Sequence, residues 1–338
     1  MMFTTTVTIM VGAAEPDAYR GRRGPAWYRG DCHVHSVFSD GELTPEQLAA
    51  AARAVGLDFI ATTEHNSVSA HSTWRGCAGD DLLVILGEEV TTGDGHWLAL
   101  ALPPGQLIDW RYGVRDGVIA ERLRDVHRVA GLCVVAHPHA PYPSGEFLFE
   151  HDGFDAVEVW NGLWSSDRPW NADNDAALAD WGRSLATDLA HGTFRPAIGN
   201  SDTHLAGQIG IPHTVVWAED RTTTAIMSGL REGRCWIAGT ADVDLSLLAG
   251  AGTRRAGIGQ RLQVRDDSLV VHLTLRGVRA GVVTVQSGHG EIYRGVLPAD
   301  GCGDLPWRAK RRDHAFIRVE VRHADGQLAA LTNPIVIE

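Results

Sequence analysis

Short apolar runs alternate with longer segments of helical spacing from Tyr28 to about residue 240. Apolar runs of about four to eight residues between turn residues are typical of buried strands, and an apolar period of about 3.6 residues indicates a helix. Strands are predicted at residues 31–35, 58–63, 82–86, 96–102, 132–136, 155–160, 197–199, 214–218 and 235–238, and helices at residues 46–55, 117–129, 172–189 and 223–230. This alternation predicts a parallel α/β architecture.

The first predicted helix has the clearest boundaries. Thr44 is a suitable N-cap, and Pro45 occupies the first helical position. Gln47 completes a capping box, in which the side chains of the N-cap and of the third helical residue accept the unpaired backbone N–H groups. Gly56 is a suitable C-terminal stop. We therefore expect this helix to form with both ends as predicted.

The strand–helix pattern ends near Thr240. Beyond it we find only short alternating runs, at residues 269–275, 282–286, 291–296, 316–322 and 328–337, with the hairpin signal Asp325-Gly326 between the last two. A small antiparallel, sandwich-like β domain is therefore predicted. The expected division is an N-terminal strand and linker over residues 1–25 (the strand at residues 3–11), an α/β domain over residues 26–240 and the β domain over residues 241–338.

Composition narrows the class of function. The chain has 42 acidic and 30 basic residues and a formal net charge of −12, so nucleic acid, which needs a basic surface, is not an expected partner. Lys310 is the only lysine, which argues against Schiff-base chemistry and against a P-loop. Five scattered cysteines without a C-x-x-C pair, and the lack of a run of membrane-spanning length, predict a cytoplasmic protein that does not bind membranes.

The stretch Asp31-Cys32-His33-Val34-His35 suggests where the chemistry lies. On a strand its two imidazoles share one face, because side chains alternate with period two. Further acidic and histidine residues follow the predicted strands downstream. The candidate metal ligands are His33, His35, Asp40, His65, Glu89, His96, His137, Asp202 and His204.

Imidazole and carboxylate groups bind divalent ions such as Zn, Mn and Fe. This set is too large for one ion, so it predicts two to three divalent metal ions that share a carboxylate, with a bridging hydroxide as the nucleophile. No G-x-S-x-G motif offers a serine nucleophile instead. Trp160, Trp164 and Trp170 fit either a pocket wall or a hydrophobic core. The histidines interpreted as structural or exposed are His71, His127, His151, His191, His213, His272, His289, His314 and His323.

From about Tyr28 to Thr240 these residues stand in motifs that resemble those of the PHP (polymerase and histidinol phosphatase) superfamily. The motifs are His33-Val34-His35, Ser39-Asp40-Gly41, Thr63-Glu64-His65-Asn66, Gly87-Glu88-Glu89, Gly95-His96, Ala136-His137-Pro138 and Gly199-Asn200-Ser201-Asp202-Thr203-His204. The phrases Glu158-Val159-Trp160-Asn161-Gly162 and Thr332-Asn333-Pro334 further resemble the carbaryl-hydrolase-like branch. The resemblance implies a distorted (β/α)7 barrel, up to three Zn, Mn or Fe ions and hydrolysis of an ester.

The resemblance also implies roles for single residues. One ion would be held by His33, His35, Glu89 and Asp202, a second by Glu89 as a bridge with His96 and His137, and a third by Asp40, His65 and His204. Asp202 and His204 are expected to take part in catalysis, and His139 is a candidate general acid for the leaving group. Glu64 stands where phosphatase members usually have Asp, and Asp40 stands where some members have His. Glu88 is interpreted as a packing residue or an outer partner of the ligands.

The expected activity is metal-dependent hydrolysis of a small-molecule phosphoester, because a cluster of three ions is suited to spreading charge over phosphate oxygens. A carboxylic or carbamate ester is the alternative that the branch resemblance supports. A metal-stabilised module that only binds other molecules is a further alternative, although its known examples usually lack ligands and none is missing here. The sequence leaves the oligomeric state open.

Overall fold

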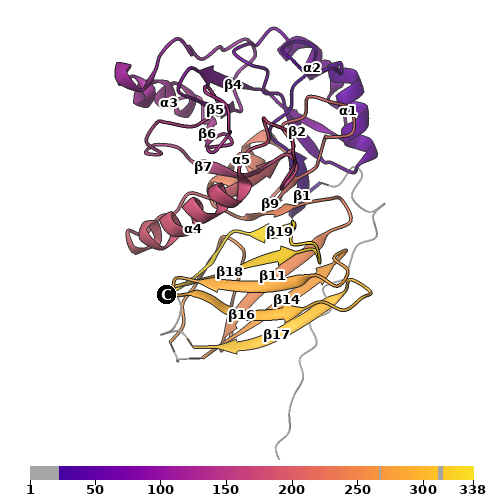
Figure 1. Cartoon of the computed structure of the whole chain (residues 1–338), viewed down its shortest axis with the longest axis vertical. Helices are drawn as coiled ribbons and strands as arrows, with labels where there is room; N and C mark the ends of the chain where they lie inside the picture. The colour runs from indigo at the N-terminus through magenta and orange to yellow at the C-terminus, as the bar shows by residue number, and fades with distance from the viewer. Residues whose placement is uncertain (1–22, 266–267, 311–314) are drawn as a thin grey trace, which may run out of the picture.

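The computed structural model describes residues 23–265, 268–310 and 315–338 (Figure 1). The strand predicted at residues 3–11 lies outside these residues. An α/β part with helices around its strands forms the upper half of Figure 1, and a β-rich C-terminal part forms the lower half. Within the described residues no helix is both long and apolar enough to cross a membrane.

Two sheets form the α/β part. In the first sheet, β1 (Ala26–Asp31) pairs in parallel with β2 (Phe59–Ala61), and β2 pairs in parallel with β3 (Leu83–Ile85). On its other side, β1 pairs antiparallel with β9 (His213–Ala218), and β9 pairs antiparallel with β10 (Cys235–Ala238). The second sheet has the order β4 (Gly87–Thr92), β5 (Gly95–Leu100), β6 (Leu132–Val135), β7 (Ala156–Asn161) and β8 (Ala197–Asn200). In it β5 runs antiparallel to both neighbours, and β6, β7 and β8 are parallel.

The regular ladders do not form the (β/α)7 barrel that the resemblance implies. The two sheets are linked near the metal-ligand motifs by isolated bridges, Val34 with Thr203 and His65 with Glu89. A two-residue hairpin joins β4 to β5 where a parallel barrel would need a helical crossover. The architecture is therefore a mixed α/β fold in which strand pairing changes direction more than once.

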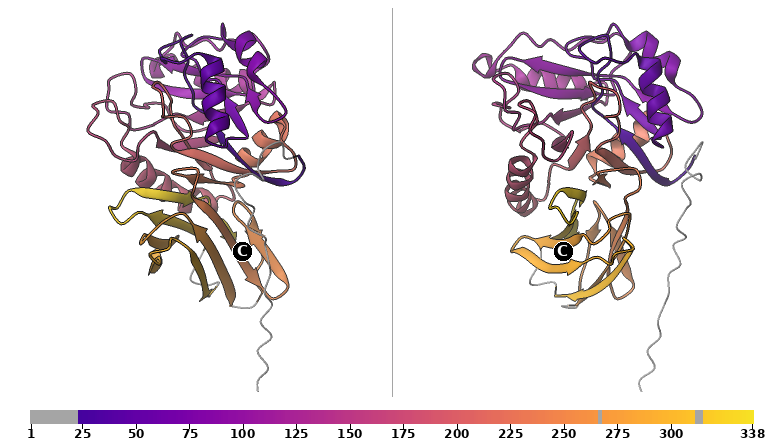
Figure 2. Two further views of the ribbon diagram at one scale, coloured as in Figure 1. Left: turned by 90° about the vertical axis from the view of Figure 1, so that its right-hand side faces the viewer. Right: turned by 45° about the vertical axis from the view of Figure 1, so that its right-hand side comes forward.

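Helices cover the outer faces of these sheets (Figures 1 and 2). They are α1 (Pro45–Ala54), α2 (His71–Cys77), α3 (Ile119–His127), α4 (Asn174–Ala190) and α5 (Thr223–Arg231), with one 3-10 turn, η2 (Val114–Asp116). The capping box of α1 is confirmed, since Thr44 Oγ1 accepts the Gln47 N–H and Gln47 Oε1 accepts the Thr44 N–H. The sequence did not predict α2, whose N-cap residue makes no side-chain hydrogen bond.

The C-terminal part consists of two facing sheets. One has the order β12 (Arg254–Gly257), β11 (Asp244–Ala251), β14 (Leu269–Arg276) and β17 (Gly303–Ala309). The other includes β13 (Arg261–Leu262), β15 (Val282–Ser287), β16 (Gly290–Val296), β18 (Phe316–Arg322), β19 (Leu328–Thr332) and β20 (Ile335–Ile337). Leu247 and Leu273 from the first sheet share a buried core with Val285 and Val319 from the second. Of these strands, β11, β12, β13 and β17 were not predicted.

One strand pair joins this region to the α/β part. Residues 236–238 of β10 pair antiparallel with residues 330–332 of β19. The side chain of Asn333, next in the chain, accepts the Ala197 N–H at 2.8 Å and donates to the carbonyl oxygens of Ala197 at 2.8 Å and Cys235 at 3.0 Å. Because Asn333 is buried, it pairs three backbone groups that water cannot reach.

We predict that Asn333→Leu strongly destabilises the protein. The substitution leaves up to three buried backbone groups unpaired, so the free energy of unfolding should fall by about 2–5 kcal/mol, as measured by urea denaturation. Gln327→Leu removes an amide from the exposed turn before β19 and should change it by less than about 0.5 kcal/mol. Equal stabilities of the two variants would contradict this role of Asn333.

Candidate metal centre

The predicted metal ligands lie together at the ends of the strands. Six of them follow a strand: His33 and His35 follow β1, His65 follows β2, His137 follows β6, and Asp202 and His204 follow β8. Glu89 lies in β4, His96 lies in β5, and Asp40 lies in the loop between β1 and α1. Every one of them lies within 3.4 Å, nitrogen to oxygen, of another member. The structure therefore brings all nine into one cluster. Of the strand predicted at residues 31–35, only Asp31 belongs to β1, and residues 32–35 follow the end of that strand.

Four donor atoms form the most enclosed part of the cluster. Glu89 Oε2 lies 3.2 Å from Nε2 of both His33 and His35. Asp202 Oδ1 lies 3.3 Å and 3.1 Å from the same two nitrogens. Ligands at about 2 Å from an ion in tetrahedral coordination lie about 3.3 Å from one another. The four atoms therefore have the spacing of ligands around a single ion.

The second oxygen of Glu89 faces a different group. Oε1 lies 3.0 Å from His96 Nδ1 and 3.1 Å from His137 Nε2. Glu89 is completely buried, so no water compensates the charge of either oxygen. A carboxylate with its oxygens directed to two sets of imidazoles is suited to bridging two cations.

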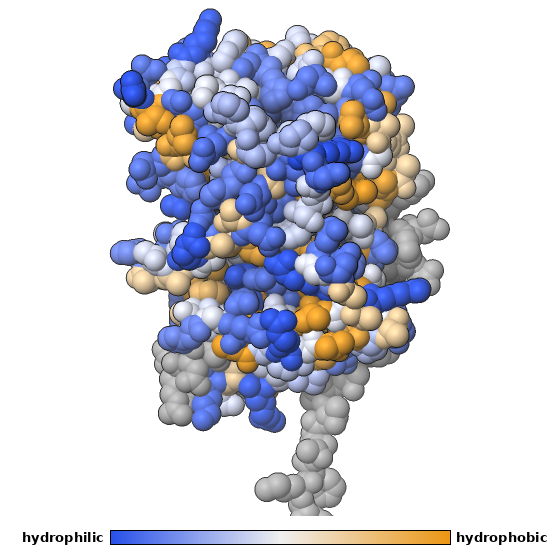
Figure 3. All heavy atoms as spheres, viewed as in Figure 1, coloured by the Kyte–Doolittle hydropathy of each residue, from blue (hydrophilic) through white to orange (hydrophobic). Residues whose placement is uncertain are grey.

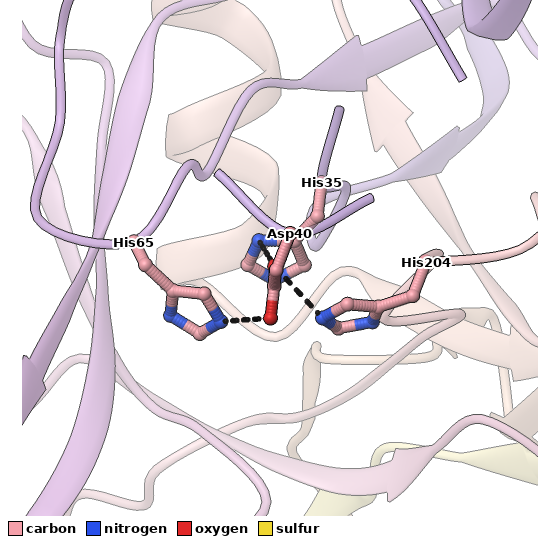
Figure 4. Close-up of side chains that lie close together, drawn as sticks. All are labelled: His35, Asp40, His65 and His204. Carbon is pink, nitrogen blue, oxygen red and sulfur yellow. Dashed lines mark ion pairs between the residues drawn. The ribbon is translucent and has the colours of Figure 1, made fainter. Parts of the chain in front are cut away.

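Figure 4 shows a third group, in which Asp40 lies between His65 and His204. Asp40 Oδ1 lies 3.2 Å from His204 Nε2, and Asp40 Oδ2 lies 3.4 Å from His65 Nε2. His35 Nδ1 is 3.8 Å from Asp40 Oδ1 on the inner side. The Asp40 side chain is 54% exposed, whereas His35 is buried. The third group thus lies between the enclosed ligands and the outside.

Glu158 is a buried carboxylate next to the cluster, and no role was predicted for it. Its Oε1 lies 3.1 Å from His33 Nδ1, and its Oε2 accepts the His137 backbone N–H at 3.0 Å. Asn161 and Asn200 donate to it at 3.0 Å and 2.8 Å. A carboxylate on Nδ1–H fixes the tautomer whose Nε2 is free for a metal. A glutamate inside the buried, otherwise mostly apolar strand β7 was the signal that could have identified it.

Glu64 has a purely supporting position. It accepts hydrogen bonds from Ser36, Ser39 and the indole N–H of Trp74. These bonds fix the loop that carries Asp40. The same loop needs Gly41, because a Cβ there would lie 2.4 Å from the carbonyl oxygen of His35.

Two other residues named from the sequence lie apart from the cluster. Glu88 points to the opposite face of β4 from Glu89 and accepts the Ile108 N–H at 2.8 Å, and burial raises its pKa to about 8. His139 Nε2 lies 2.6 Å from Asp180 of α4 and does not line the pocket above the cluster. The structure thus gives the proposed general-acid role of His139 no geometric support.

Unpartnered polar atoms test whether cations fit this site. Six buried donor atoms of the cluster have no hydrogen-bond partner, namely His33 Nε2, His35 Nε2, His96 Nε2, His137 Nδ1, Glu89 Oε2 and Asp202 Oδ1. Buried polar atoms are nearly always paired, so this concentration requires an explanation. Divalent cations would satisfy most of these atoms together, and the residues present therefore fit them.

The electrostatics of the cluster agree with this. Burial alone would raise the pKa of Glu89, but His65 and His33 outweigh it and hold the pKa well below its usual range. Burial would lower the pKa of His65, but Glu89 and Asp40 outweigh it and raise the pKa to about 10. Likewise Asp40 and Asp202 outweigh burial and raise the pKa of His204 to about 9. The carboxylates therefore create a field that attracts positive charge, either protons or metal ions.

Two of the ligands have strained backbones. His137 has φ 25° and Asp202 has φ 49°, in the left-handed region that residues with a Cβ rarely adopt. Such strain costs about 1–3 kcal/mol per residue and persists where the surroundings impose it, often at functional sites. In both cases the strain turns a side chain toward Glu89 or His33 directly after a strand ends.

A pocket of about 530 Å³ lies over the cluster. Its floor contains Asp40, His65, His96, His137, Asp202 and His204. Its walls include Tyr142, Asn161, Leu163, Arg168, Trp170, Leu205 and Gln208. Trp170 is thus a wall residue, whereas Trp160 and Trp164 belong to a buried core. A small molecule in this pocket would reach several of the candidate ligands.

Comparisons with known proteins agree with this picture. Residues 31–130 match the PHP domain, and residues 183–235 match a region described as PHP-associated. An uncharacterised protein of Methanocaldococcus jannaschii is 24% identical over 147 residues, which make up 39% of this chain and 81% of that protein. The carbaryl-hydrolase-like branch is not among these findings and stays a prediction.

The fold has a match in a solved structure. A two-domain protein of Bacteroides vulgatus, described as containing a predicted PHP-like metal-dependent phosphoesterase, superposes with a TM-score of 0.53 at 17% identity. The superposition covers 92% of this chain and 96% of that one, so it includes the β-rich C-terminal region. The chain thus resembles PHP and PHP-associated sequences over these two segments, and it shares with that structure a mixed α/β fold with an added β-rich C-terminal part.

Proposed function

We propose that this protein is a metal-dependent phosphoesterase that hydrolyses a small-molecule ester with two or three divalent ions. The observation that carries the proposal is the position of Glu89, whose two buried oxygens face two different sets of imidazoles. The PHP-domain match and the description of the Bacteroides vulgatus protein support a hydrolase of this class. The open pocket above the ligands argues for catalysis rather than for a purely structural site.

The chain's own residues would divide the work. His33, His35, Glu89 and Asp202 would hold the innermost ion, His96 and His137 would share Glu89 to hold the second, and Asp40, His65 and His204 would hold the third. Ions bound in this way supply Lewis acidity and neutralise charge on the reacting group. The donors are nitrogen and oxygen without thiolate, a set that suits Zn, Mn or Fe.

Proton positions follow from the hydrogen bonds. His204 Nδ1 lies 2.9 Å from the backbone oxygen of Asp202, so Nδ1 carries the proton and Nε2 faces Asp40. Asn161 Nδ2 donates to Asp202 Oδ2 at 3.2 Å, which fixes the carboxylate with Oδ1 toward His33 and His35. The inner ligands are thereby oriented before any substrate arrives, which is the condition for electrostatic stabilisation at low reorganisation cost.

A carboxylic or carbamate ester remains the second candidate, and one observation favours it. The pocket walls expose apolar surface, with Trp170 58%, Leu163 47% and Leu205 39% exposed. Such walls suit an apolar aryl group beside the reacting ester, as in an aryl carbamate.

The first prediction concerns metal content. Protein purified without a tag should carry at least two divalent ions per chain by elemental analysis. Stripping the ions with a chelator should lower the melting temperature, and adding Zn or Mn at about 100 times the Kd should restore about 2.7 kcal/mol of stability. Fewer than one ion per chain, together with no thermal shift, would contradict the proposed centre.

The second prediction compares two neighbouring acids. Glu89→Gln removes the charge that would serve two ions, so we expect loss of metal and a fall in kcat/KM of several orders of magnitude with the fold retained by circular dichroism. Glu88→Gln is the matched control, because burial keeps Glu88 largely neutral at pH 7 and it points away from the cluster. Retention of metal and activity by Glu89→Gln would disprove the bridging role.

The third prediction separates the ester classes. A phosphoester spreads developing charge over several oxygens, whereas a carbamate or carboxylic ester develops one oxyanion. Asp40→Ala removes a ligand of the outer group only. It should abolish hydrolysis of a nitrophenyl phosphate and lower hydrolysis of a naphthyl carbamate by no more than about tenfold, or roughly 1.4 kcal/mol.

The same assay has two informative failures. If the wild type hydrolyses only the carbamate, the phosphoesterase assignment is wrong and the second candidate replaces it. If Asp40→Ala loses both activities equally, Asp40 supports the whole cluster and the outer group has no separate role. Asp167→Ala, an exposed acid outside the pocket lining, controls for a general loss of negative charge.

A further inference from the structure

The pocket walls differ in chemistry from its floor. One wall comes from the loop between β7 and α4, which contributes Leu163, Arg168, Trp170 and Asn171. None of these residues belongs to the candidate metal ligands. They would face the part of a bound substrate that does not react.

Trp170 is the tryptophan that lines this pocket, and its side chain is largely exposed. Its side chain is 58% exposed at a pocket wall, next to the half-exposed Leu163 from the same loop and Leu205 from the loop after β8. On the face seen in Figure 3, by contrast, hydrophobic residues form small, separate patches within a mostly hydrophilic surface. Apolar surface that faces a ligand pocket is stabilised when a flat apolar group covers it.

Arg168 is unusual among the arginines that lie over tryptophans. Its guanidinium carbon lies 5.9 Å from the centre of the Trp170 ring. In the other such pairs of the described residues, the arginine also forms an ion pair with a carboxylate. These are Arg29 over Trp236 (paired with Asp244), Arg111 over Trp110 (with Asp109), Arg318 over Trp181 (with Glu320) and Arg322 over Trp164 (with Asp175). The guanidinium of Arg168 has no carboxylate partner among the described residues. Arg168 therefore brings a positive charge to the pocket lining that no carboxylate of the described residues pairs with.

We propose that Arg168 and Trp170 form a subsite for an aromatic group that carries one negative charge, such as a carboxylate, on the non-reacting part of the substrate. This inference rests on the proposed function, because it places the reacting ester over the metal ligands. The indole offers a flat face for stacking, and the planar guanidinium beside it can bind an oxyanion through two N–H donors. The substrate class is then an aryl ester whose ring bears an anionic substituent.

The charge of the pocket lining limits how many negative charges the substrate can carry away from the reacting ester. Arg168 is the only Arg or Lys among the lining residues, and Asp40 and Asp202 are its lining acids. One fixed cation suits one remote negative charge, whereas a molecule with a chain of phosphates would place further anions against uncharged wall residues. Leu163 and Leu205 suit the edges of an aromatic ring.

The test uses two matched substrates, 2-naphthyl phosphate and 6-carboxy-2-naphthyl phosphate. Arg168→Gln should lower kcat/KM on the carboxylated substrate about 10–100-fold more than on 2-naphthyl phosphate, which lacks the carboxylate; this is the range expected for a hydrogen bond to a charged group. Trp170→Ala should lower kcat/KM on both naphthyl substrates about three- to tenfold more than on methyl phosphate. Arg75→Gln, an exposed arginine of α2 outside the pocket, is the control.

The outcomes distinguish the subsite from the catalytic proposal. An equal loss on both naphthyl substrates in Arg168→Gln would show that Arg168 contacts the reacting group, and no loss would show that it binds neither; both results overturn the subsite. If the wild type hydrolyses no ester, the proposed function fails on its own. The subsite is then tested by calorimetry, in which the wild type should bind 2-naphthoate more tightly than 2-naphthylmethanol and Arg168→Gln should lose that preference. Equal binding of the two ligands by the wild type would overturn the subsite.

Discussion

The buried carboxylate of Glu89 is the constraint on which the rest of the site depends. One oxygen contacts imidazoles of His33, His35 and His65, and the other contacts His96 and His137. An isolated buried carboxylate is too costly to remain ionised, so positive charge must gather around it. The imidazoles provide that charge only when protonated, and then they repel one another. Cations between the carboxylates and neutral imidazoles would compensate the buried negative charge without this repulsion. The side chains are therefore best interpreted as metal ligands.

The β4–β5 hairpin explains how this arrangement is built. Glu89 lies opposite Leu98, and His96 lies opposite Thr91. Glu89 and His96 are therefore diagonal neighbours on one face of an antiparallel pair, within reach of each other. A helical crossover at this point would have separated them. The departure from a regular parallel barrel is thus part of the construction of the centre.

The sequence predicted which side chains lie together at the site better than it predicted the fold around them. Motif spacing identified the nine side chains, because most of them lie next to an apolar run that had to be a strand. Glu158 was named only within a phrase that resembles the carbaryl-hydrolase-like branch and received no role, since its partner atoms His33 Nδ1 and the His137 N–H come from segments far away in the chain. The contact between His139 and Asp180 of α4 could not be foreseen from the local pattern, and the general-acid role of His139 stays a prediction. The closure of the sheets by isolated bridges also has no local signal, and neither does the exposure of Trp170 beside Arg168.

The motif residues that are not candidate ligands also have a structural role. Most of the candidate ligands follow the end of a strand ladder, and Glu89 lies in the edge strand β4, so nearby backbone N–H groups need other acceptors. Thr63 Oγ1 accepts the Val34 N–H, Asn200 Oδ1 accepts the Cys32 N–H, and Asn66 Oδ1 accepts the Thr91 N–H. Each acceptor stands within four residues of a ligand along the chain. A motif of this kind therefore encodes two things together: a side chain for the metal, and a hydroxyl or amide that replaces the hydrogen bond which the sheet no longer supplies.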